Sequence, residues 1–234
     1  MKAVVLAGGL GTRLRERVPE LPKPMAPVAG RPFLAYVLDA LMRDGFDDIV
    51  LSVGYRWEAI RAHFGASYGG AAIRYAVEAE PLGTGGAIAH AFATAGIAGT
   101  EAALVLNGDT FLDLDFAALR GWYEEQPVAC AMVLRQVDDT ARYGSVEVAG
   151  GLVTGFAEKG RSEPGLINAG VYVLQADVFA KFKLAGRFAL EADLLQRHCA
   201  DLAPRAFVTD AYFIDIGVPQ DFDRAQTELP ALTT

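Results

Sequence analysis

The sequence has few of the residues that build disulfide frameworks or zinc sites. It has two cysteines, Cys130 and Cys199, which stand far apart and show no CxxC spacing. We therefore expect reduced thiols in the core instead of a disulfide or a redox motif. The three histidines are isolated from one another, which excludes the ligand spacing of a zinc cluster.

Long apolar runs and an excess of positive charge are missing as well. No run of about twenty apolar residues occurs, which excludes a membrane-spanning helix. The apolar stretch near the N-terminus ends at Gly8-Gly9 and is too short for the core of a signal peptide. The formal net charge of −8 opposes binding to nucleic acid or to an anionic membrane, so a small polyanion would need a local basic site and a divalent cation. We expect a cytoplasmic protein with small-molecule partners, and the sequence leaves its oligomeric state open.

Hydrophobic residues make up 52% of the 234 residues, enough to bury a substantial core. In the first half, strand-like runs alternate with segments whose apolar residues follow helical spacing. The strand-like runs are 2–6, 48–53, 72–77 and 102–106, and the helical segments are 33–41, 57–64 and 86–95. This alternation predicts a Rossmann-like, doubly wound, mostly parallel α/β sheet with helices on both faces.

The second half is less regular. Strand-like runs are expected at 128–135, 144–148, 152–157, 166–174, 206–209 and 212–216. Gly150-Gly151 is typical of a hairpin turn, the spacing in 189–199 predicts an amphipathic helix, and Pro219 suits the first turn of a last helix. Because no linker or repeat interrupts the chain, we expect one domain over residues 1–234. Its nucleotide-binding half would be 1–110, and 111–234 would add mixed strands.

A glycine-rich segment, LAGGLGTRL (residues 6–14), follows the first expected strand. The dinucleotide-binding fingerprint needs a third glycine where Leu14 stands, and the Walker pattern needs Lys-Ser where Thr12-Arg13 stands. The segment instead predicts a turn whose free backbone N–H groups bind an anion, completed by the guanidinium of Arg13. A tight turn without a ligand is the alternative.

Lys23 stands between two prolines in the segment LPKPM, residues 21–25. Prolines fix the backbone and remove competing donors, so the ammonium would project from a stiff segment. This pattern favours a second cationic group at an anion site. The alternative is an ordinary exposed lysine in a loop.

Two aspartates at distant places in the chain are candidate metal ligands. Asp109 follows the strand-like run 102–106, at the carboxyl end where ligands of open α/β sheets bind. Asp215 lies between Ile214 and Ile216, where a buried carboxylate needs a counter-charge. A Mg²⁺ ion shared by the two aspartates would supply that charge and hold phosphate oxygens as well. The alternatives are an Asn-Gly-Asp turn for Asp109 and a solvent-facing edge strand for Asp215.

A second glycine-rich turn, EPLGTGGA (residues 80–87), leads into a helix. Its backbone groups can lie edge-on to a flat base, and Thr84 is a candidate N-cap. Glu78 or Glu80 could accept hydrogen bonds from the N1 and N2 donors of guanine. Exposed glutamates without such a role are the alternative.

Five segments, LAGGLGTRL, PKPM, EPLGTGGA, NGDT and DIG, follow one another in this order. Together they resemble the sugar-1-phosphate nucleotidylyltransferases, over nearly the whole chain. Six segments are most similar to the branch that transfers guanylyl groups to D-glycero-α-D-manno-heptose 1-phosphate: KPMAPVAGRPFLAYVLDAL, LSVGY, EAEPLGTGGAI, NGDTFLDLD, RYGSVE and GLINAGVYVL. The resemblance implies a glycosyltransferase-A-like fold, GTP and a sugar 1-phosphate as substrates, and Mg²⁺ as cofactor.

The resemblance also implies roles for single residues. The catalytic residues would be Arg13, Lys23, Asp109 and Asp215, with the two aspartates on Mg²⁺. The nucleotide would lie against Leu6, Ala7, Gly8, Gly9, Gly11, Thr12, Arg13, Lys23, Glu78, Pro81, Gly83, Thr84, Asn107 and Gly108. The half at 111–234 would bind the sugar phosphate through Tyr143, Gly144, Glu158, Lys159, Asn168, Ala169 and Gly170. Lys159 would bind the phosphate of the sugar and Glu158 its hydroxyl groups.

The chain departs from the family pattern at Ala189 and Val218, where relatives often carry hydroxyl residues. Both departures remove a hydroxyl group that could form a hydrogen bond near the sugar or the metal, although the metal ligands themselves are present. The same chemistry on mannose 1-phosphate with GTP, or on N-acetylmuramic acid 1-phosphate with UTP, remains an alternative. A non-catalytic nucleotide-sugar sensor is a rival from another class, which the presence of Arg13, Lys23 and both aspartates disfavours.

Overall fold

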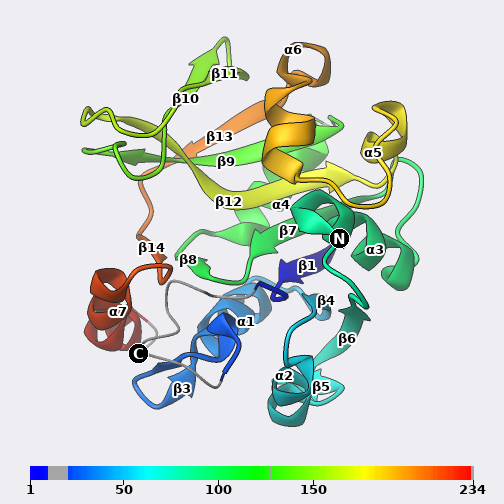
Figure 1. Ribbon diagram of the computed structural model, residues 1–234, viewed down its shortest axis with the longest axis vertical. Helices are drawn as coiled ribbons and strands as arrows, with labels where there is room; N and C mark the ends of the chain where they lie inside the picture. The colour runs from blue at the N-terminus through cyan, green and yellow to red at the C-terminus, as the bar shows by residue number, and fades with distance from the viewer. Residues whose placement is uncertain (10–20, 127, 233–234) are drawn as a thin grey trace.

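The computed structural model describes residues 1–9, 21–126 and 128–232. The strands are β1 (Lys2–Leu6), β2 (Pro27–Val28), β3 (Arg31–Pro32), β4 (Asp48–Val53), β5 (Ser67–Tyr68), β6 (Ala71–Val77), β7 (Ala102–Asn107), β8 (Thr110–Leu112), β9 (Cys130–Val137), β10 (Val146–Ala149), β11 (Leu152–Phe156), β12 (Gly165–Gln175), β13 (Arg205–Thr209) and β14 (Phe213–Asp215). The helices are α1 (Phe33–Arg43), α2 (Trp57–Phe64), α3 (Gly83–Ala95), α4 (Phe116–Glu125), α5 (Val178–Lys181), α6 (Cys199–Leu202) and α7 (Pro219–Leu232). Among the described residues, ten of the strands form one sheet in the order β10-β11-β13-β9-β12-β7-β1-β4-β6-β5 (Figure 1).

The first half of the chain builds a parallel block within this sheet. β1 lies between β7 and β4, and β6 follows β4 with all four strands parallel. Such strands are covered on both faces, which explains their nearly continuous apolar sequences. The four strands expected in this half are confirmed to within one residue at each end.

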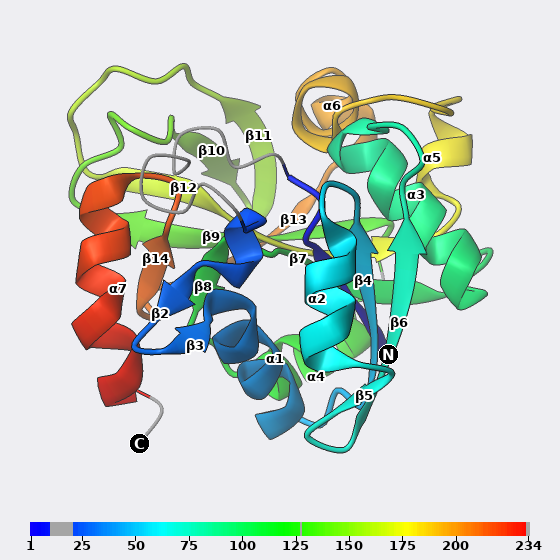
Figure 2. The same ribbon diagram turned by 60° about the horizontal axis from the view of Figure 1, so that its bottom comes forward.

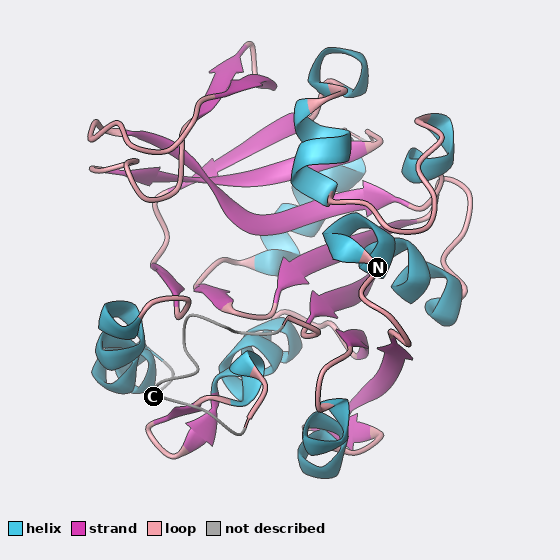
Figure 3. Cartoon of the chain, in the orientation of Figure 1, coloured by secondary structure: helices cyan, strands magenta, loops and turns pink. Residues whose placement is uncertain are grey.

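Helices cover both faces of the parallel block, as the strand–helix alternation predicts (Figures 2 and 3). Side chains alternate along β1, so Val5 faces one apolar cluster and Val4 the other. The cluster around Val5 contains residues of α1, α2, α4 and α7. The cluster around Val4 contains residues of α3, α5 and α6. None of the described helices is both long enough and apolar enough to cross a membrane.

The second half of the chain extends the sheet with mixed strands. β12 runs antiparallel between β7 and β9, and β13 lies parallel to β9 on its other side. β10 and β11 form the expected hairpin, whose turn holds Gly150 and Gly151 at φ values of 59° and 77°. These left-handed values favour glycine. β12 joins the two halves, because it pairs with β7 on one side and with β9 on the other.

Two expectations about local structure are wrong. The segment 189–199 is not a regular amphipathic helix, because residues Leu190–Gln196 form a π-helix that is followed by α6. The backbone N–H of Leu190 donates to Thr84 Oγ1 and that of Ala189 to Asp193 Oδ2. The first backbone N–H groups of the segment are therefore paired with side-chain oxygens. Thr84 is also not an N-cap, since α3 begins at Gly83 with Leu82 in the capping position.

Both cysteines are buried and free, as the sequence predicts. Burial raises the pKa of each thiol above its ordinary value, most strongly for Cys130. We expect neither thiol to react with Ellman's reagent in the folded protein, because the thiolate is the reactive form. Both should react after unfolding in guanidinium chloride, which absorbance at 412 nm measures in each state. Fast reaction of one thiol in the native protein would contradict this burial.

Candidate active site

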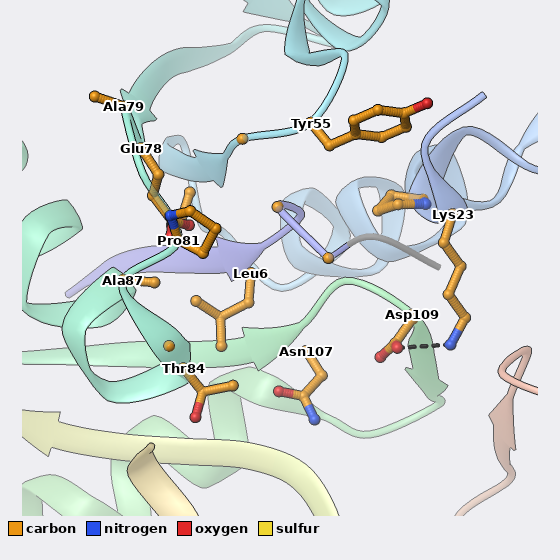
Figure 4. A pocket seen from close by; sticks show the side chains of 16 residues that line it. Leu6, Lys23, Tyr55, Glu78, Ala79, Pro81, Thr84, Ala87, Asn107 and Asp109 are labelled. Atoms are coloured by element: carbon orange, nitrogen blue, oxygen red, sulfur yellow. Dashed lines mark hydrogen bonds and ion pairs between the residues drawn. The ribbon is translucent and has the colours of Figure 1, made fainter. Parts of the chain in front are cut away.

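A cavity of about 630 Å³ opens at the carboxyl ends of β1, β4, β6 and β7 (Figure 4). This is the edge of a parallel sheet at which ligands bind. The cavity is lined by Leu6, Gly8, Gly9, Lys23, Pro24, Ser52, Gly54, Tyr55, Glu78, Ala79, Pro81, Gly83, Thr84, Ala87, Asn107 and Asp109. Most of the residues that the sequence assigns to a nucleotide therefore face one cavity. Gly11, Thr12 and Arg13 lie outside the described residues.

The side chain of Lys23 connects the two predicted metal ligands. Its Nζ lies 2.6 Å from Asp109 Oδ2 and 3.5 Å from Asp215 Oδ1. Lys23 belongs to a single 3₁₀ turn, Lys23–Met25, and its side chain is 9% exposed. The flanking prolines fix this turn so that the ammonium points to Asp109, as Figure 4 shows. The alternative of an ordinary exposed lysine is thus wrong.

Strand pairing brings Asp109 and Asp215 together from distant parts of the chain. β8 and β14 are antiparallel, and Asp215 pairs with Thr110, the residue after Asp109. The backbone N–H of Ile216 also donates to the carbonyl of Asp109, at 3.1 Å. Gly108 allows the turn before Asp109, because a Cβ there would lie 2.6 Å from the carbonyl oxygen of Leu6.

Asp215 is held by donors on both of its carboxylate oxygens. The backbone N–H of Gly217 donates to Oδ1 at 2.7 Å, and Arg142 Nη2 donates to Oδ2 at 3.1 Å. The carboxylate is 21% exposed, so the alternative of a solvent-facing edge aspartate is wrong. Burial opposes the charge of Arg142, but its hydrogen bond to Asp221 and nearby carboxylates outweigh burial and raise its pKa. Sequence reasoning missed Arg142, which directly precedes the predicted site residue Tyr143.

The oxygens of Asp109 and Asp215 fit a divalent cation of the magnesium type. They already face one positive charge, the ammonium of Lys23, and carboxylate oxygens are the donors that Mg²⁺ prefers. Among the described residues, no group of three or more histidine, cysteine or acidic side chains could hold a metal. Two carboxylates suit an ion that takes its other ligands from phosphate and water.

Glu78 borders the cavity next to the first glycine-rich segment. Its Oε1 accepts from Ser52 Oγ at 3.3 Å and its Oε2 from the backbone N–H of Leu82 at 3.0 Å. A Cβ at Gly8 would lie 2.9 Å from Glu78 Oε1, which explains a glycine there. Of the two glutamates considered for the base, Glu78 lines the cavity and Glu80 is exposed outside it.

The second glycine-rich turn packs closely against the segment before the π-helix. A Cβ at Gly83 would lie 2.5 Å from the carbonyl oxygen of Phe188, and one at Gly86 would lie 2.4 Å from that of Gly186. Thr84 Oγ1 donates to Glu191 Oε2 at 3.1 Å. These glycines therefore serve close packing, while Gly83 and Thr84 also line the cavity.

Gly85→Ala tests this packing. Alanine ordinarily stabilises a helix relative to glycine, but here its Cβ would lie 2.2 Å from the buried ring of Phe188. We expect a loss of about 1–3 kcal/mol in the free energy of unfolding, measured by denaturant titration. The matched control is Gly121→Ala in α4, where a Cβ would meet no atom within 4 Å. Equal stability changes in the two variants would contradict the packing argument.

Asn168, Ala169 and Gly170 form an irregularity in β12 that reaches the cavity side of β7. Gly170 has φ +70°, and a Cβ there would lie 2.5 Å from Asn107 Nδ2. Asn168 Nδ2 donates to the hydroxyl of Tyr172, which donates in turn to Glu191 Oε1. Burial raises the pKa of Tyr172 well above its ordinary value, so its hydroxyl remains a donor. Ala169 is fully buried, so neither its side chain nor its backbone is exposed to a ligand.

The other predicted sugar-phosphate residues lie on the Asp215 side of the site. The ring of Tyr143 packs edge-on against Phe213, 5.8 Å between centroids. Gly144 sits against the start of the turn that holds Glu158 and Lys159, since its Cβ would lie 2.7 Å from the carbonyl oxygen of Ala157. Glu158 and Lys159 are exposed and form no hydrogen bond or ion pair with another described residue.

Residues 2–231 match the family described as "Nucleotidyl transferase". The chain belongs to this family. Two members are named D-glycero-alpha-D-manno-heptose 1-phosphate guanylyltransferase. The one from Aneurinibacillus thermoaerophilus is 41% identical over 98% of both chains. The one from Campylobacter jejuni is 42% identical over 95% of this chain and 97% of that one.

Other members of the family are also similar. The mannose-1-phosphate guanylyltransferase of Mycobacterium tuberculosis is 34% identical over 97% of this chain, which spans 64% of that protein. Among solved structures, HddC from Yersinia pseudotuberculosis complexed with GMP-PN has a TM-score of 0.84 and 35% identity, over 96% of this chain and 97% of that one. The fold is thus that of a nucleotidyltransferase.

Proposed function

We propose that this protein transfers the guanylyl group of GTP to D-glycero-α-D-manno-heptose 1-phosphate, giving GDP-heptose and pyrophosphate. The observation that carries the proposal is the convergence of Lys23, Asp109 and Asp215 at the end of the parallel strands. The choice of substrates is supported by the relatives from A. thermoaerophilus and C. jejuni, which are named for this reaction and are similar over nearly their whole lengths. Because GTP is a cytoplasmic metabolite, we also place the reaction in the cytoplasm.

In this proposal the first half of the chain binds the nucleotide. The triphosphate would lie against Gly8 and Gly9 and meet the ammonium of Lys23, while the base would lie near Glu78 and the start of α3. Both oxygens of Glu78 are already fixed by Ser52 and Leu82, so the carboxylate is held ready to accept from guanine. Gly11, Thr12 and Arg13 keep their proposed role at the triphosphate.

Asp109 and Asp215 would hold Mg²⁺ in place of the ammonium that now faces them. When bound, the ion would neutralise charge on the phosphates and polarise them towards attack. Lys23 would then turn its charge to the same phosphates. Arg142 and Gly217 would keep Asp215 in place through the donors described above.

The second half would present the sugar phosphate. Tyr143, Gly144 and the exposed turn with Glu158 and Lys159 lie on the Asp215 side. Lys159 has no described partner and would bind the phosphate of the sugar 1-phosphate. Glu158 would accept hydrogen bonds from the hydroxyl groups of the sugar. The bulge from Asn168 to Gly170, packed on Asn107, would connect this side to the nucleotide.

In the proposed reaction, an oxygen of the sugar 1-phosphate attacks the α-phosphorus of GTP in line. A new P–O bond forms as the bond from the α-phosphorus to the bridging oxygen breaks, and pyrophosphate leaves. The attacking phosphate is an anion at neutral pH, so no covalent enzyme intermediate is needed. Catalysis is then positioning and charge neutralisation, and positioning alone contributes about 7–11 kcal/mol in favourable cases.

Pyrophosphate release from a panel of substrates tests the proposal. GTP, UTP and ATP would each be combined with heptose, mannose and N-acetylmuramic acid 1-phosphates, with and without Mg²⁺. We expect the highest kcat/KM for GTP with the heptose phosphate, and none without the metal. A preference for GTP with mannose 1-phosphate would instead indicate the activity for which the M. tuberculosis relative is named. A preference for UTP with N-acetylmuramic acid 1-phosphate would indicate a uridylyltransferase. Binding of nucleotide without any release would indicate a sensor.

A further inference from the structure

Arg142 bridges two carboxylates from the C-terminal part of the chain. Its Nη2 donates to Asp215 Oδ2 at 3.1 Å and to the backbone carbonyl of Asp215 at 3.2 Å. Its Nη1 donates to Asp221 Oδ2. The guanidinium also lies over the ring of Tyr143, 4.9 Å from its centroid. Arg142 therefore contacts a predicted metal ligand and a predicted sugar-phosphate residue at once.

The carboxylate of Asp221 holds Arg142 at the terminal nitrogen that does not contact Asp215. Its side chain is 10% exposed, and its other oxygen accepts from Arg224 Nη1 at 3.0 Å. A buried carboxylate with two guanidinium partners has few other positions to take. The guanidinium of Arg142, held by Asp221 and by the ring of Tyr143, is thus a rigid donor towards Asp215.

We infer that Arg142 is a positioning residue for the metal: it orients the Asp215 carboxylate so that Oδ1 points to the place shared with Asp109. The inference rests on the proposed function for the presence of Mg²⁺ at these two aspartates. Gly217 and Lys23 both approach Oδ1, at 2.7 Å and 3.5 Å, whereas Arg142 takes Oδ2. Oδ2 is therefore bound to Arg142, and Oδ1 faces the site shared with Asp109.

A direct contact between Arg142 and the sugar phosphate is the competing role. Both terminal nitrogens of the guanidinium are already used by Asp215 and Asp221. The bonds to Asp215 and Asp221 take three of the five N–H donors of Arg142. A phosphate at the remaining donors would lie beside both carboxylates, which repel it, whereas the nearby Lys159 is exposed and has no described partner. The geometry therefore favours orientation of Asp215.

The test is binding of Mn²⁺, a paramagnetic probe for the magnesium site, to the full chain with a non-hydrolysable GTP analogue. Free Mn²⁺ is counted by electron paramagnetic resonance for wild type, Arg142→Gln, Arg142→Lys and Arg224→Gln. We expect Arg142→Gln to weaken Mn²⁺ binding about 10–100-fold, the usual effect of losing a hydrogen-bond partner of a ligand. Arg142→Lys keeps the charge but has only one donor group, so its Mn²⁺ affinity should lie between those of wild type and Arg142→Gln. Arg224→Gln is the matched control, because it removes a guanidinium that contacts Asp221 and Glu228 but not Asp215. This variant should bind Mn²⁺ like wild type.

Three results would overturn the inference. One is wild-type Mn²⁺ affinity in Arg142→Gln with a raised KM for the sugar 1-phosphate, which would assign Arg142 to that substrate. Another is wild-type affinity with only a lower melting temperature, which would make Arg142 structural. The third is equal weakening in Arg224→Gln. If Arg142→Gln does not fold, Asp221→Asn, which loosens Arg142 without removing it, must weaken Mn²⁺ binding by a smaller factor. Because no sugar phosphate or turnover enters the measurement, inactivity in the substrate panel would contradict the proposed function and not this inference.

Discussion

Lys23→Ala is expected to lower the kcat of nucleotidyl transfer about 10²–10³-fold, the usual cost of removing one group that stabilises developing charge. The ammonium is nearly buried and faces both Asp109 and Asp215. Arg142 also pairs with Asp215, on its other oxygen, but no bond between Arg142 and Asp109 is found among the described residues. Without it, two carboxylates face each other with less compensation. We therefore also expect a lower melting temperature without Mg²⁺, and a larger rise on adding Mg²⁺ than in the wild type.

Two variants show whether the charge or the structure is responsible. Lys23→Arg keeps a positive charge in the same stiff segment and should recover part of the turnover. Lys181→Ala removes a lysine from another pair, 3.0 Å from Asp177 on the exposed side of α5, and should leave kcat unchanged. Wild-type kcat in Lys23→Ala would refute the catalytic role of Lys23. A melting temperature that does not respond more strongly to Mg²⁺ would refute its role between the carboxylates.

Asp215→Asn is expected to reduce kcat/KM at least about 100-fold. Loss of a residue that only supports a metal ligand costs 10–100-fold, so loss of a ligand should cost more. The new amide nitrogen would also meet a donor in either orientation, Arg142 Nη2 or the N–H of Gly217, because each carboxylate oxygen accepts a bond. Pyrophosphate release at saturating GTP, measured over a range of Mg²⁺ concentrations, gives the size of the effect and the apparent metal affinity.

Asp109→Asn provides the comparison within the site. It should lower turnover by a similar factor, but with a smaller loss of thermal stability, because Asp109 is 40% exposed and no bond to Arg142 is broken. Asp48→Asn removes a carboxylate that pairs with Arg74 at the start of β4, and should leave turnover intact. If Asp215→Asn kept wild-type dependence on Mg²⁺, its assignment as a ligand would be wrong.

The core elements of this fold could be predicted because their signals are local. Continuous apolar runs mark β1, β4 and β7, and these strands end within a residue of their expected bounds. The position of Asp109 followed from a general rule for parallel sheets. The partnership of Asp109 with Asp215 followed from the cost of a buried charge, which demands a counter-charge somewhere.

The remaining features depend on contacts between distant segments. Nothing near Arg142 in the sequence indicates that it reaches Asp215, because the contact joins a loop to β14. The π-helix after Ala189 could not be foreseen either, since Thr84 of α3 binds the N–H of Leu190. The glycines at the start of α3 suggested a flat ligand, whereas much of their purpose is close packing against Phe188.

The pairing of β8 with β14 has a consequence for the order of folding. Asp215 reaches its place only when a strand near the end of the chain docks. Lys23 and Asp109 come earlier in the chain, in turns that follow β1 and β7 of the parallel block. A nascent chain on the ribosome would thus form the nucleotide-binding side of the cavity before it could catalyse nucleotidyl transfer. During refolding, catalytic activity should therefore return more slowly than secondary structure. The rate at which activity returns would measure how fast β14 docks against β8.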